Sequence, residues 1–101
     1  MEEKYEIFVG RLGVNPDLRY TAKKEPVCTL SVAVNKENEE KPEWKRVIVW
    51  GKQAELCSLY LKKGYEVFVQ GRKLLKEFTT SEGHKKSYEE INASLIGFSN
   101  L

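Results

Sequence analysis

The sequence predicts an all-β domain of five short strands closed into a barrel, with one helix between the third and fourth strands. Runs in which apolar and polar residues alternate recur along the chain, as is typical of half-buried strands. One stretch, beginning near residue 52, has helical spacing instead. A sheet this small would expose two aggregation-prone edges if it stayed open, so closure is expected. This element order is that of an OB-fold barrel, and an open α+β sheet with one covering helix is the alternative.

Length and composition predict a single domain over residues 1–101 that folds in water. Apolar residues make up 41% and charged residues 32% of the chain, which indicates a globular rather than a disordered protein. The formal net charge is only +2, so attraction for a nucleic acid must come from local clusters of cations. No apolar run is long enough to span a membrane, and the N-terminus lacks a signal-peptide layout. We expect a cytoplasmic protein without membrane contact.

The first strand is expected at Tyr5–Leu12, where β-favouring residues are interrupted by Gly10 at a possible bend. Gly13–Asp17 follows as a turn, because Asn-Pro-Asp favours turn initiation. Pro26–Asn35 shows the clearest alternation in the chain and is the second strand. The charged segment Lys36–Pro42 then connects it, as a hairpin loop, to the third strand.

The third strand, Glu43–Trp50, carries both tryptophans of the chain on one face. Even spacing places Trp44, Arg46 and Trp50 together with Ile48 on one side, while Lys45, Val47 and Val49 take the other. At about 3.3 Å per residue the indoles stand roughly 20 Å apart with the guanidinium between them. Two interpretations follow. Either the indoles are outward platforms for the bases of a single-stranded nucleic acid, or they are core beneath a second layer, as tryptophan usually is.

A helix is expected at Lys52–Lys63, with a buried stripe of Leu56, Leu59 and Tyr60, and with Cys57 and Leu61 alongside. Cys28 and Cys57 are far apart in sequence and lack a CxxC spacing. They are therefore expected to be small buried residues in a reducing compartment, without a disulfide.

The fourth strand, Glu66–Phe78, repeats the basic and aromatic pattern of the third. Arg72, Lys76 and Phe78 share its outward face, whereas Val67, Val69 and Gly71 point inward. Phe78 could instead be a core residue at the strand end. Thr79–Lys86 forms a hairpin tip in which Gly83 can adopt positive φ, and Ser87–Gly97 is the final strand.

Enzymatic chemistry has little support in the sequence, and no catalytic residue, metal or cofactor is expected. The single histidine, His84, lies in the predicted hairpin tip beside two lysines and is expected to be a solvated loop residue. Neither a phosphate-cradling glycine loop nor a metal-ligand cluster nor a nucleophile elbow is found. The chain is expected to bind rather than to catalyse.

Four segments in order, FVGRLGVNPDLRYT, EWKRVIVWGKQAE, YLKKGYEVFVQGR and KEFTTSEG, give the chain a strong resemblance to a known family. The sequence resembles the bacterial single-stranded DNA-binding proteins over nearly its whole length. The resemblance implies an OB-fold that assembles as a homotetramer, usually through its N-terminal strand. It also implies wrapping of single-stranded DNA without sequence preference in replication, recombination or repair, and a nucleoid-associated location.

The resemblance assigns nucleic-acid-binding roles to individual positions. Base stacking falls on Trp44, Trp50 and Phe78. Contacts with the DNA backbone fall on Arg46 and Lys76, and also on Lys45, Arg72 and Lys52. From its place in the predicted hairpin tip, Lys85 is added as a residue at the margin of this cationic track.

The sequence also departs from the family pattern. Asn35–Asn38 holds no aromatic residue where members often have one, Leu74 replaces a common basic residue, and Phe78 stands where tryptophan is usual. The chain ends at Leu101, whereas bacterial members typically continue into a flexible tail that ends in acidic residues and a hydrophobic tip. Contacts with replication or repair proteins therefore stay open, and the sequence fits either a shortened chain or a naturally short relative.

An OB-fold primosomal adaptor is the alternative function. Such a protein is a dimer and acts mainly through protein–protein contacts, with DNA binding secondary. The retained set of Trp44, Trp50 and Phe78 favours a single-stranded DNA-binding protein, because an adaptor has no need of stacking platforms.

Overall fold

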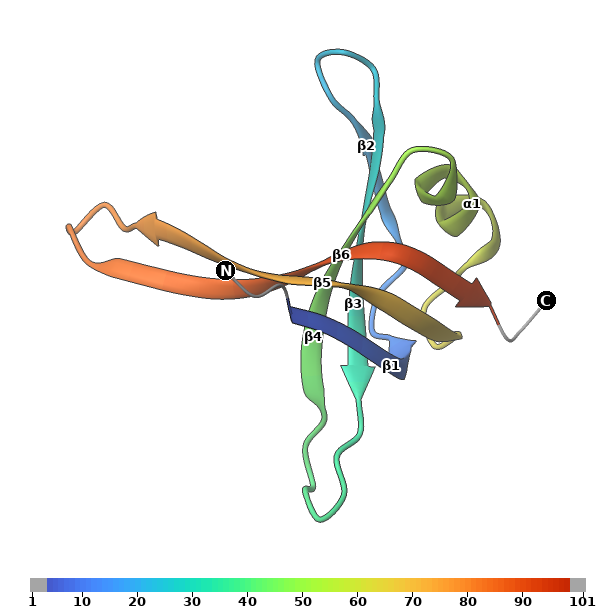
Figure 1. The fold of residues 1–101 in the computed structure, drawn as a ribbon, viewed down its shortest axis with the longest axis horizontal. Coiled ribbons are helices and arrows are strands. Elements are labelled where there is room, and N and C mark those ends of the chain that lie inside the picture. Colours follow the sequence, from blue (N-terminus) through green and yellow to red (C-terminus); the bar gives the residue numbers. More distant parts are fainter. Residues whose placement is uncertain (1–3, 99–101) are drawn as a thin grey trace.

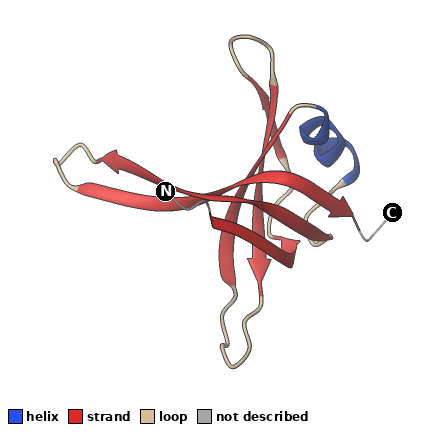
Figure 2. Cartoon of the chain, in the orientation of Figure 1, coloured by secondary structure: helices blue, strands red, loops and turns tan. Residues whose placement is uncertain are grey.

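The computed structural model describes residues 4–98, and residues 1–3 and 99–101 lie outside this part. The elements in chain order are β1 (Lys4–Leu12), β2 (Asp17–Tyr20), β3 (Pro26–Val34), β4 (Glu43–Trp50), α1 (Lys52–Tyr60), β5 (Glu66–Thr79) and β6 (Lys85–Phe98). Strands dominate, and α1 is the single helix of the described residues (Figure 2). The predicted all-β class with one helix is confirmed.

Five of the strands close into a ring. The sheet has the order β1-β5-β6-β4-β3-β2, and β1 also pairs with β3 (Figure 1). The two closing contacts are short: β1 meets β3 through Arg11 and Leu12, and β4 meets β6 in parallel through Val47 and Ile48. A closed five-strand ring with one helix is the arrangement that an OB-fold requires, so the open-sheet alternative is wrong.

The interior of the ring is filled by the inward side chains that strand alternation predicts. Val47 and Val49 of β4 and Val67 and Val69 of β5 are fully buried, as expected. Cys28 on β3 and Cys57 on α1 are also buried and unbonded, as predicted. Burial raises the pKa of the Cys28 thiol to about 11 and that of Cys57 to about 12, so both are neutral, packing thiols.

The strand β2 was missed by the sequence-based prediction, which ended the preceding turn at Asp17. Asp17 instead begins β2, which pairs antiparallel with β3 from Asp17 opposite Thr29 to Tyr20 opposite Pro26. Asn15 in the turn just before β2 ties this turn to the segment after α1, because its Oδ1 accepts a 2.8 Å hydrogen bond from the Lys63 N–H. The helix therefore lies between the fourth and fifth strands, and the remaining order is as predicted.

The helix is shorter than predicted and uses a different face. It ends at Tyr60, because Leu61 adopts an extended conformation and turns its side chain into the core. Ala54 and Cys57 are its buried residues, whereas Leu59 and Tyr60 are exposed. The prediction of a Leu56, Leu59 and Tyr60 stripe is thus wrong. Small side chains face the sheet because α1 packs closely against β3.

The strands β5 and β6 continue past the ring as a two-stranded arm, which we define as residues 74–90 (Figure 1). Their antiparallel pairing runs from Val67 opposite Phe98 to Thr79 opposite Lys85, with one register shift between Gln70 and Gly71. Gly83 at the tip has a φ of 88°, as predicted. β6 starts at Lys85 rather than Ser87, so the tip is tighter than predicted.

Candidate nucleic-acid interface

The outward face of β4 presents both tryptophans to solvent. The exposed fraction is 58% for Trp44 and 44% for Trp50, and Arg46 between them is also exposed. The interpretation of these indoles as core residues is therefore wrong for the described chain. Strand pairing explains the exposure of Trp44 and Arg46, because the positions opposite them on β3 hold only Ala33 and Ser31. Small neighbours leave the sides of the large side chains uncovered.

A second aromatic pair lies on the arm. Phe78 of β5 is 46% exposed and Tyr88 of β6 is 41% exposed, so Phe78 is not a core residue. Their ring centroids are 5.9 Å apart with the planes tilted by 56°. The Arg46 guanidinium carbon lies 5.8 Å from the centroid of the Tyr88 ring, within cation–π distance. Tyr88 thus connects the aromatic residues of the arm with the cation on β4.

Strand register places the predicted cations of β5 on this same side. Lys76 lies opposite Tyr88, and Arg72 lies opposite Asn92, which itself pairs with Ile48 of β4. Residues directly opposite in paired strands share one face. We call this surface the aromatic face and define it by Trp44, Arg46, Trp50, Arg72, Lys76, Phe78 and Tyr88. Six of these seven residues were predicted from the sequence as site residues, and β4, β6 and β5 bring them onto one side.

Two polar contacts hold side chains of the aromatic face in place. The Arg46 Nε lies 3.3 Å from Glu90 Oε2, and the carboxylate side chain of Glu90 is largely buried. The Trp50 indole Nε1–H donates to Asn92 Oδ1 at 3.4 Å. Both partners come from β6, the strand next to β4. The arginine is therefore oriented before any ligand arrives, and a phosphate would share it with Glu90.

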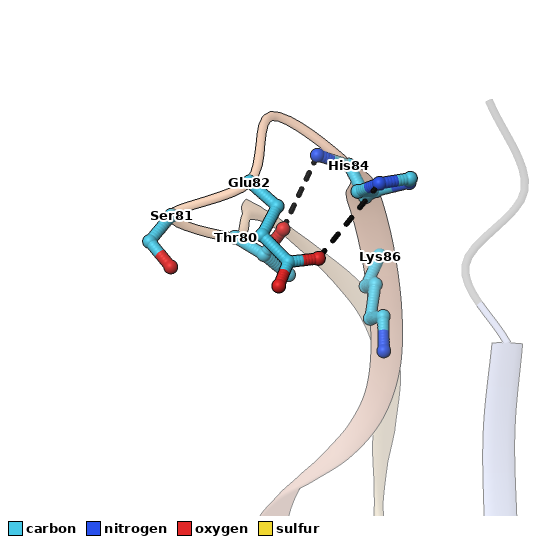
Figure 3. A pocket seen from close by; sticks show the side chains of 5 residues that line it. All are labelled: Thr80, Ser81, Glu82, His84 and Lys86. Atoms are coloured by element: carbon cyan, nitrogen blue, oxygen red, sulfur yellow. Dashed lines mark hydrogen bonds and ion pairs between the residues drawn. The ribbon is translucent and has the colours of Figure 1, made fainter.

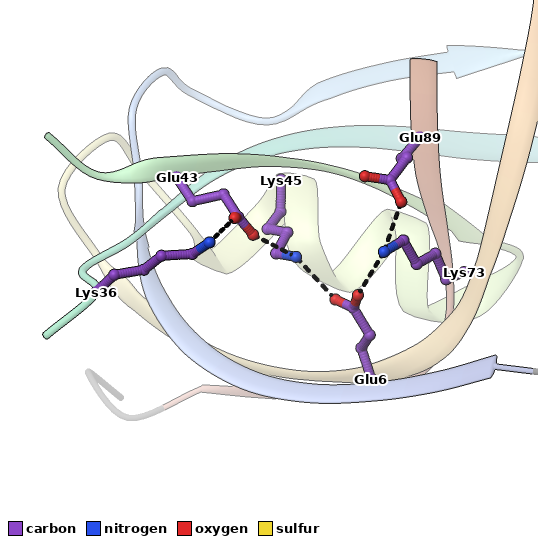
Figure 4. A network of polar contacts seen from close by, with 6 residues as sticks. All are labelled: Glu6, Lys36, Glu43, Lys45, Lys73 and Glu89. Carbon is purple, nitrogen blue, oxygen red and sulfur yellow. Dashed lines mark hydrogen bonds and ion pairs between the residues drawn. The ribbon is translucent and has the colours of Figure 1, made fainter. Parts of the chain in front are cut away.

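Lys45 lies apart from the aromatic face. Its side chain points to the inner side of the ring, where Nζ lies 3.0 Å from Glu6 Oε2 and 2.6 Å from Glu43 Oε1 (Figure 4). Glu43 also pairs with Lys36, and Glu6 also pairs with Lys73. This ion-pair network joins β1, β4 and β5. Lys45 has two carboxylate partners here and is not brought to the tryptophans.

The network sets the charge of its members. Hydrogen bonds from Lys36 and then Lys45 lower the pKa of the Glu43 carboxyl to about 2. Burial of Lys45 opposes its charged form, but the hydrogen bonds with Glu43 and Glu6 outweigh this effect and raise its pKa. The hydrogen bond to Glu43 also raises the pKa of Lys36. Glu43, Lys45 and Lys36 are therefore ionised near neutral pH.

The remaining predicted cations, Lys52 and Lys85, lie at the margins of the aromatic face. Lys52 is an exposed residue in the first turn of α1, two positions after Trp50. Lys85 lies opposite Thr79, whereas Lys86 lies opposite Phe78 and so shares the face of that aromatic ring. Lys86, rather than Lys85, is the tip lysine on the aromatic face.

The hairpin tip encloses an open hollow lined by Thr80, Ser81, Glu82, His84 and Lys86 (Figure 3). The His84 backbone N–H donates to Thr80 Oγ1 at 3.2 Å, and the His84 Nε2 lies 4.0 Å from Glu82 Oε2. Both His84 and Glu82 are exposed, and the hydrogen bond shapes the turn. His84 is thus the solvated loop residue that the sequence predicts.

The sequence-based prediction omits Tyr88 from the site and places Lys85, rather than Lys86, at the margin of the cationic track. The register of the hairpin would identify both Tyr88 and Lys86. A tip centred on residue 82 places Lys76 opposite Tyr88 and Phe78 opposite Lys86. The predicted tip, Thr79–Lys86, was centred half a residue later, and this offset is enough to change which side chains share a face.

Within residues 4–98 no helix is long and apolar enough to cross a bilayer. Nor do His, Cys, Asp and Glu side chains of this part gather in groups of three or more that could hold a metal ion.

Comparison with known proteins agrees with this geometry. Residues 5–99 match the single-strand binding protein family. Single-stranded DNA-binding protein 1 of Xylella fastidiosa (strain 9a5c) is 38% identical over 93 residues, which cover 84% of this chain and 68% of that protein. Single-stranded DNA-binding protein 1 of Chlorobaculum tepidum is 34% identical over 93 residues, covering 84% of this chain and 57% of that protein. The chain therefore belongs to the single-strand binding protein family.

Proposed function

We propose that this protein binds single-stranded DNA without sequence preference and protects it during replication, recombination or repair. The observation that carries the proposal is the pair of exposed indoles, Trp44 and Trp50, on one face of β4 with Arg46 between them. Tryptophan is highly buried on average, so two indoles exposed on one face of a strand indicate an interaction surface. The names of the two relatives and the family support the same ligand.

Stacking explains the lack of sequence preference. Every base has a flat π surface, so an aromatic platform accepts all four bases, and each stacked base contributes about 1–3 kcal/mol. Trp44, Trp50 and Phe78 are the proposed platforms. Tyr88 adds a fourth ring, because it lies 5.9 Å from Phe78 and is exposed to a similar degree. A strand crossing from β4 to the arm would meet these rings in succession.

Phosphate contacts are assigned to Arg46, Arg72 and Lys76. They lie on the face that carries the rings, so a strand with its bases stacked keeps its phosphates near cations. Arg46 already bonds Glu90, so phosphate binding there replaces or shares an ion pair. Because the net charge is only +2, long-range attraction is weak and local contacts must supply the affinity.

We also propose that the chain assembles as a homotetramer through β1. Tyr5, Ile7 and Val9 form an exposed apolar row on the outer side of this strand, which we call the β1 stripe. Along Glu6–Gly10 the strand pairs with β5 on one side only, and within residues 4–98 β3 joins it no earlier than Arg11. An apolar row beside an open strand edge suits pairing with a second copy.

A titration with poly(dT) tests the proposed function. Stacking should quench the intrinsic tryptophan fluorescence, and a duplex of equal length should bind much more weakly because its bases are not available. Light scattering on the same samples reports the assembly. A tetramer supports the proposal, whereas a dimer without fluorescence quenching would favour the adaptor function. Equal affinity for duplex and poly(dT) would refute stacking as the mode of binding.

A further inference from the structure

The indole of Trp44 ends against the backbone of Gly13, at the start of the connection between β1 and β2. A Cβ placed on Gly13 would lie 2.4 Å from both Cη2 and Cζ3 of Trp44 but 3.7 Å from Cε3. An atom above the flat face of the ring would be almost as close to Cε3 as to Cζ3. Gly13 therefore meets the outer edge of the six-membered ring, and this contact leaves both flat faces of the indole uncovered.

Hydrogen bonds to other segments of the chain hold the backbone around Gly13 in place. The Gly13 N–H donates to the Ser31 carbonyl at 2.9 Å, and the Leu12 N–H donates to the Tyr65 carbonyl at 3.0 Å. The Leu12 side chain is also buried in the core. The segment cannot withdraw from Trp44 without losing these contacts. The indole, in contrast, is largely exposed and can rotate about its side-chain torsions.

Glycine is required at position 13 because there is no room for a side chain, and not because of its backbone conformation. The glycines with positive φ in the described residues are Gly51, Gly64 and Gly83, and Gly13 is not among them. Its backbone can accept an L-residue, so an added methyl group would act on the ring edge. Contacts between a Cβ and a carbon at 2.4 Å do not occur in proteins, so the ring would have to move by about an ångström to restore van der Waals distance.

We propose that Gly13 is a positioning residue that sets where the Trp44 platform stands on the aromatic face. The two indoles of β4 are then oriented by different means. Trp50 is oriented by its hydrogen bond to Asn92, and Trp44 by the contact between the edge of its ring and Gly13. Since Gly13 acts through Trp44, this inference rests on the proposed stacking function. A side chain at position 13 would displace the platform while the ring of strands stays folded.

A double-mutant cycle between Gly13→Ala and Trp44→Ala tests the inference through the affinity for poly(dT). Trp44→Ala should weaken binding by about 5- to 150-fold, the range for one stacked base. Gly13→Ala alone should weaken it by about fivefold or more, toward the lower end of that range. Adding Gly13→Ala to Trp44→Ala should cause no further loss, because the ring that the methyl group displaces is gone.

A spectroscopic measurement separates displacement of the ring from a general structural defect. In a Trp50→Phe background, Trp44 is the single tryptophan. Gly13→Ala should then change its emission maximum and its quenching by acrylamide in the free protein. Gly97→Ala is the matched control: its Cβ would lie 3.3 Å from Phe68 Cβ, far along β6, and it should leave the Trp44 emission unchanged. Should Gly13→Ala lower the melting temperature, adding Trp44→Ala must restore it.

The outcomes distinguish this inference from the proposed function. Additive losses in the cycle, or unchanged affinity and emission in Gly13→Ala, would overturn the role of Gly13 while leaving Trp44 as a platform. Unchanged affinity in Trp44→Ala itself would overturn the stacking proposal, and the positioning role with it. A non-additive cycle together with a shifted Trp44 emission supports the positioning role.

Discussion

The outer faces of β4 and β1 both expose large apolar side chains, yet their surroundings differ. On β4, Arg46 lies between Trp44 and Trp50, and the β3 residues opposite Trp44 and Arg46 are small. On β1, Tyr5, Ile7 and Val9 follow one another at every second position with no cation between them. Exposed apolar area makes both of them candidate interaction surfaces. The residues placed between the apolar side chains indicate the partner.

Backbone pairing sharpens this difference. Every residue of β4 from Glu43 to Trp50 pairs with β3, and the middle of the strand also pairs with β6. β1 leaves one edge open along Glu6–Gly10 within the described chain. A base needs a flat side chain and a nearby cation, whereas a second copy of the protein needs an apolar row and unpaired N–H and C=O groups. Each surface has the features that its proposed partner requires.

The largest effect is expected from Ile7→Glu, which tests the β1 stripe. Ile7 is 65% exposed in the single chain, so the fold should tolerate the change. A carboxylate buried without a partner at a subunit interface costs several kcal/mol, so the assembly should dissociate. Sedimentation equilibrium at micromolar concentration should show the mass of a smaller species.

Leu59→Glu is the control for this experiment, because Leu59 is an equally exposed apolar residue on α1. It should leave the mass unchanged. A monomeric parent protein, or an Ile7→Glu variant with the parent mass, would contradict the role given to β1.

The next largest effect is expected from Trp44→Ala and Trp50→Ala, which test the β4 face. Each should weaken binding to poly(dT) by about 1–3 kcal/mol through the loss of one stacked base. Because both indoles are exposed, the free energy of unfolding from urea titration should change much less. Tyr60→Ala, at an exposed aromatic residue of α1, should change neither quantity appreciably. A Trp44→Ala variant that loses stability but keeps its affinity per folded molecule would contradict the role of Trp44 as a platform. The proposed difference between the β4 face and the β1 face would then fail.

The smallest effect concerns the ion-pair network that joins β1 to β4 on the inner side of the ring. Glu43 has its pKa lowered from 4.5 to about 2 by Lys36 and Lys45. A depressed folded-state pKa adds stability that is present above pH 4.5 and is lost as the pH falls from 4.5 toward 2. Glu43→Gln should therefore lose less stability than the parent between pH 5 and pH 2.5, as measured by urea midpoints. An equal loss of stability in Glu43→Gln and the parent would show that the ionised Glu43 side chain does not contribute to stability. The effect is small because solvent screens the carboxylate.

Much of the fold followed from strand patterns that repeat every second residue. Val47, Val49, Val67 and Val69 were assigned to the interior because β-branched residues alternate with polar ones, and all four are buried. The short strand β2 is not predicted because Asn-Pro-Asp signals a turn. Its four residues are also too few to show the alternation of apolar and polar side chains that predicts a strand. The helix face was mistaken because close packing against β3 selects Ala54 and Cys57 over larger leucines.

The candidate site was predictable where one strand carries it and less so where two strands meet. Trp44, Arg46 and Trp50 lie on one strand, so their shared face follows from the sequence alone. Tyr88 and Lys86 join the aromatic face through the hairpin register, which a shift of half a residue in the turn alters. Lys45 lies on the inner side of β4, as its odd position predicted, but its partners Glu6 and Glu43 could be identified only after the ring had closed.

The salt dependence of binding to poly(dT), compared between Arg46→Ala and Trp50→Ala, tests the central claim most directly. If the face neutralises Z phosphates, log K should fall with log salt at a slope near −0.7Z. Arg46→Ala should make this slope shallower by about 0.7 and weaken all sequences alike. Trp50→Ala should lower the affinity with a nearly unchanged slope, because stacking releases no counterions. Equal changes of slope in both variants would contradict the assignment of the β4 face as the binding surface.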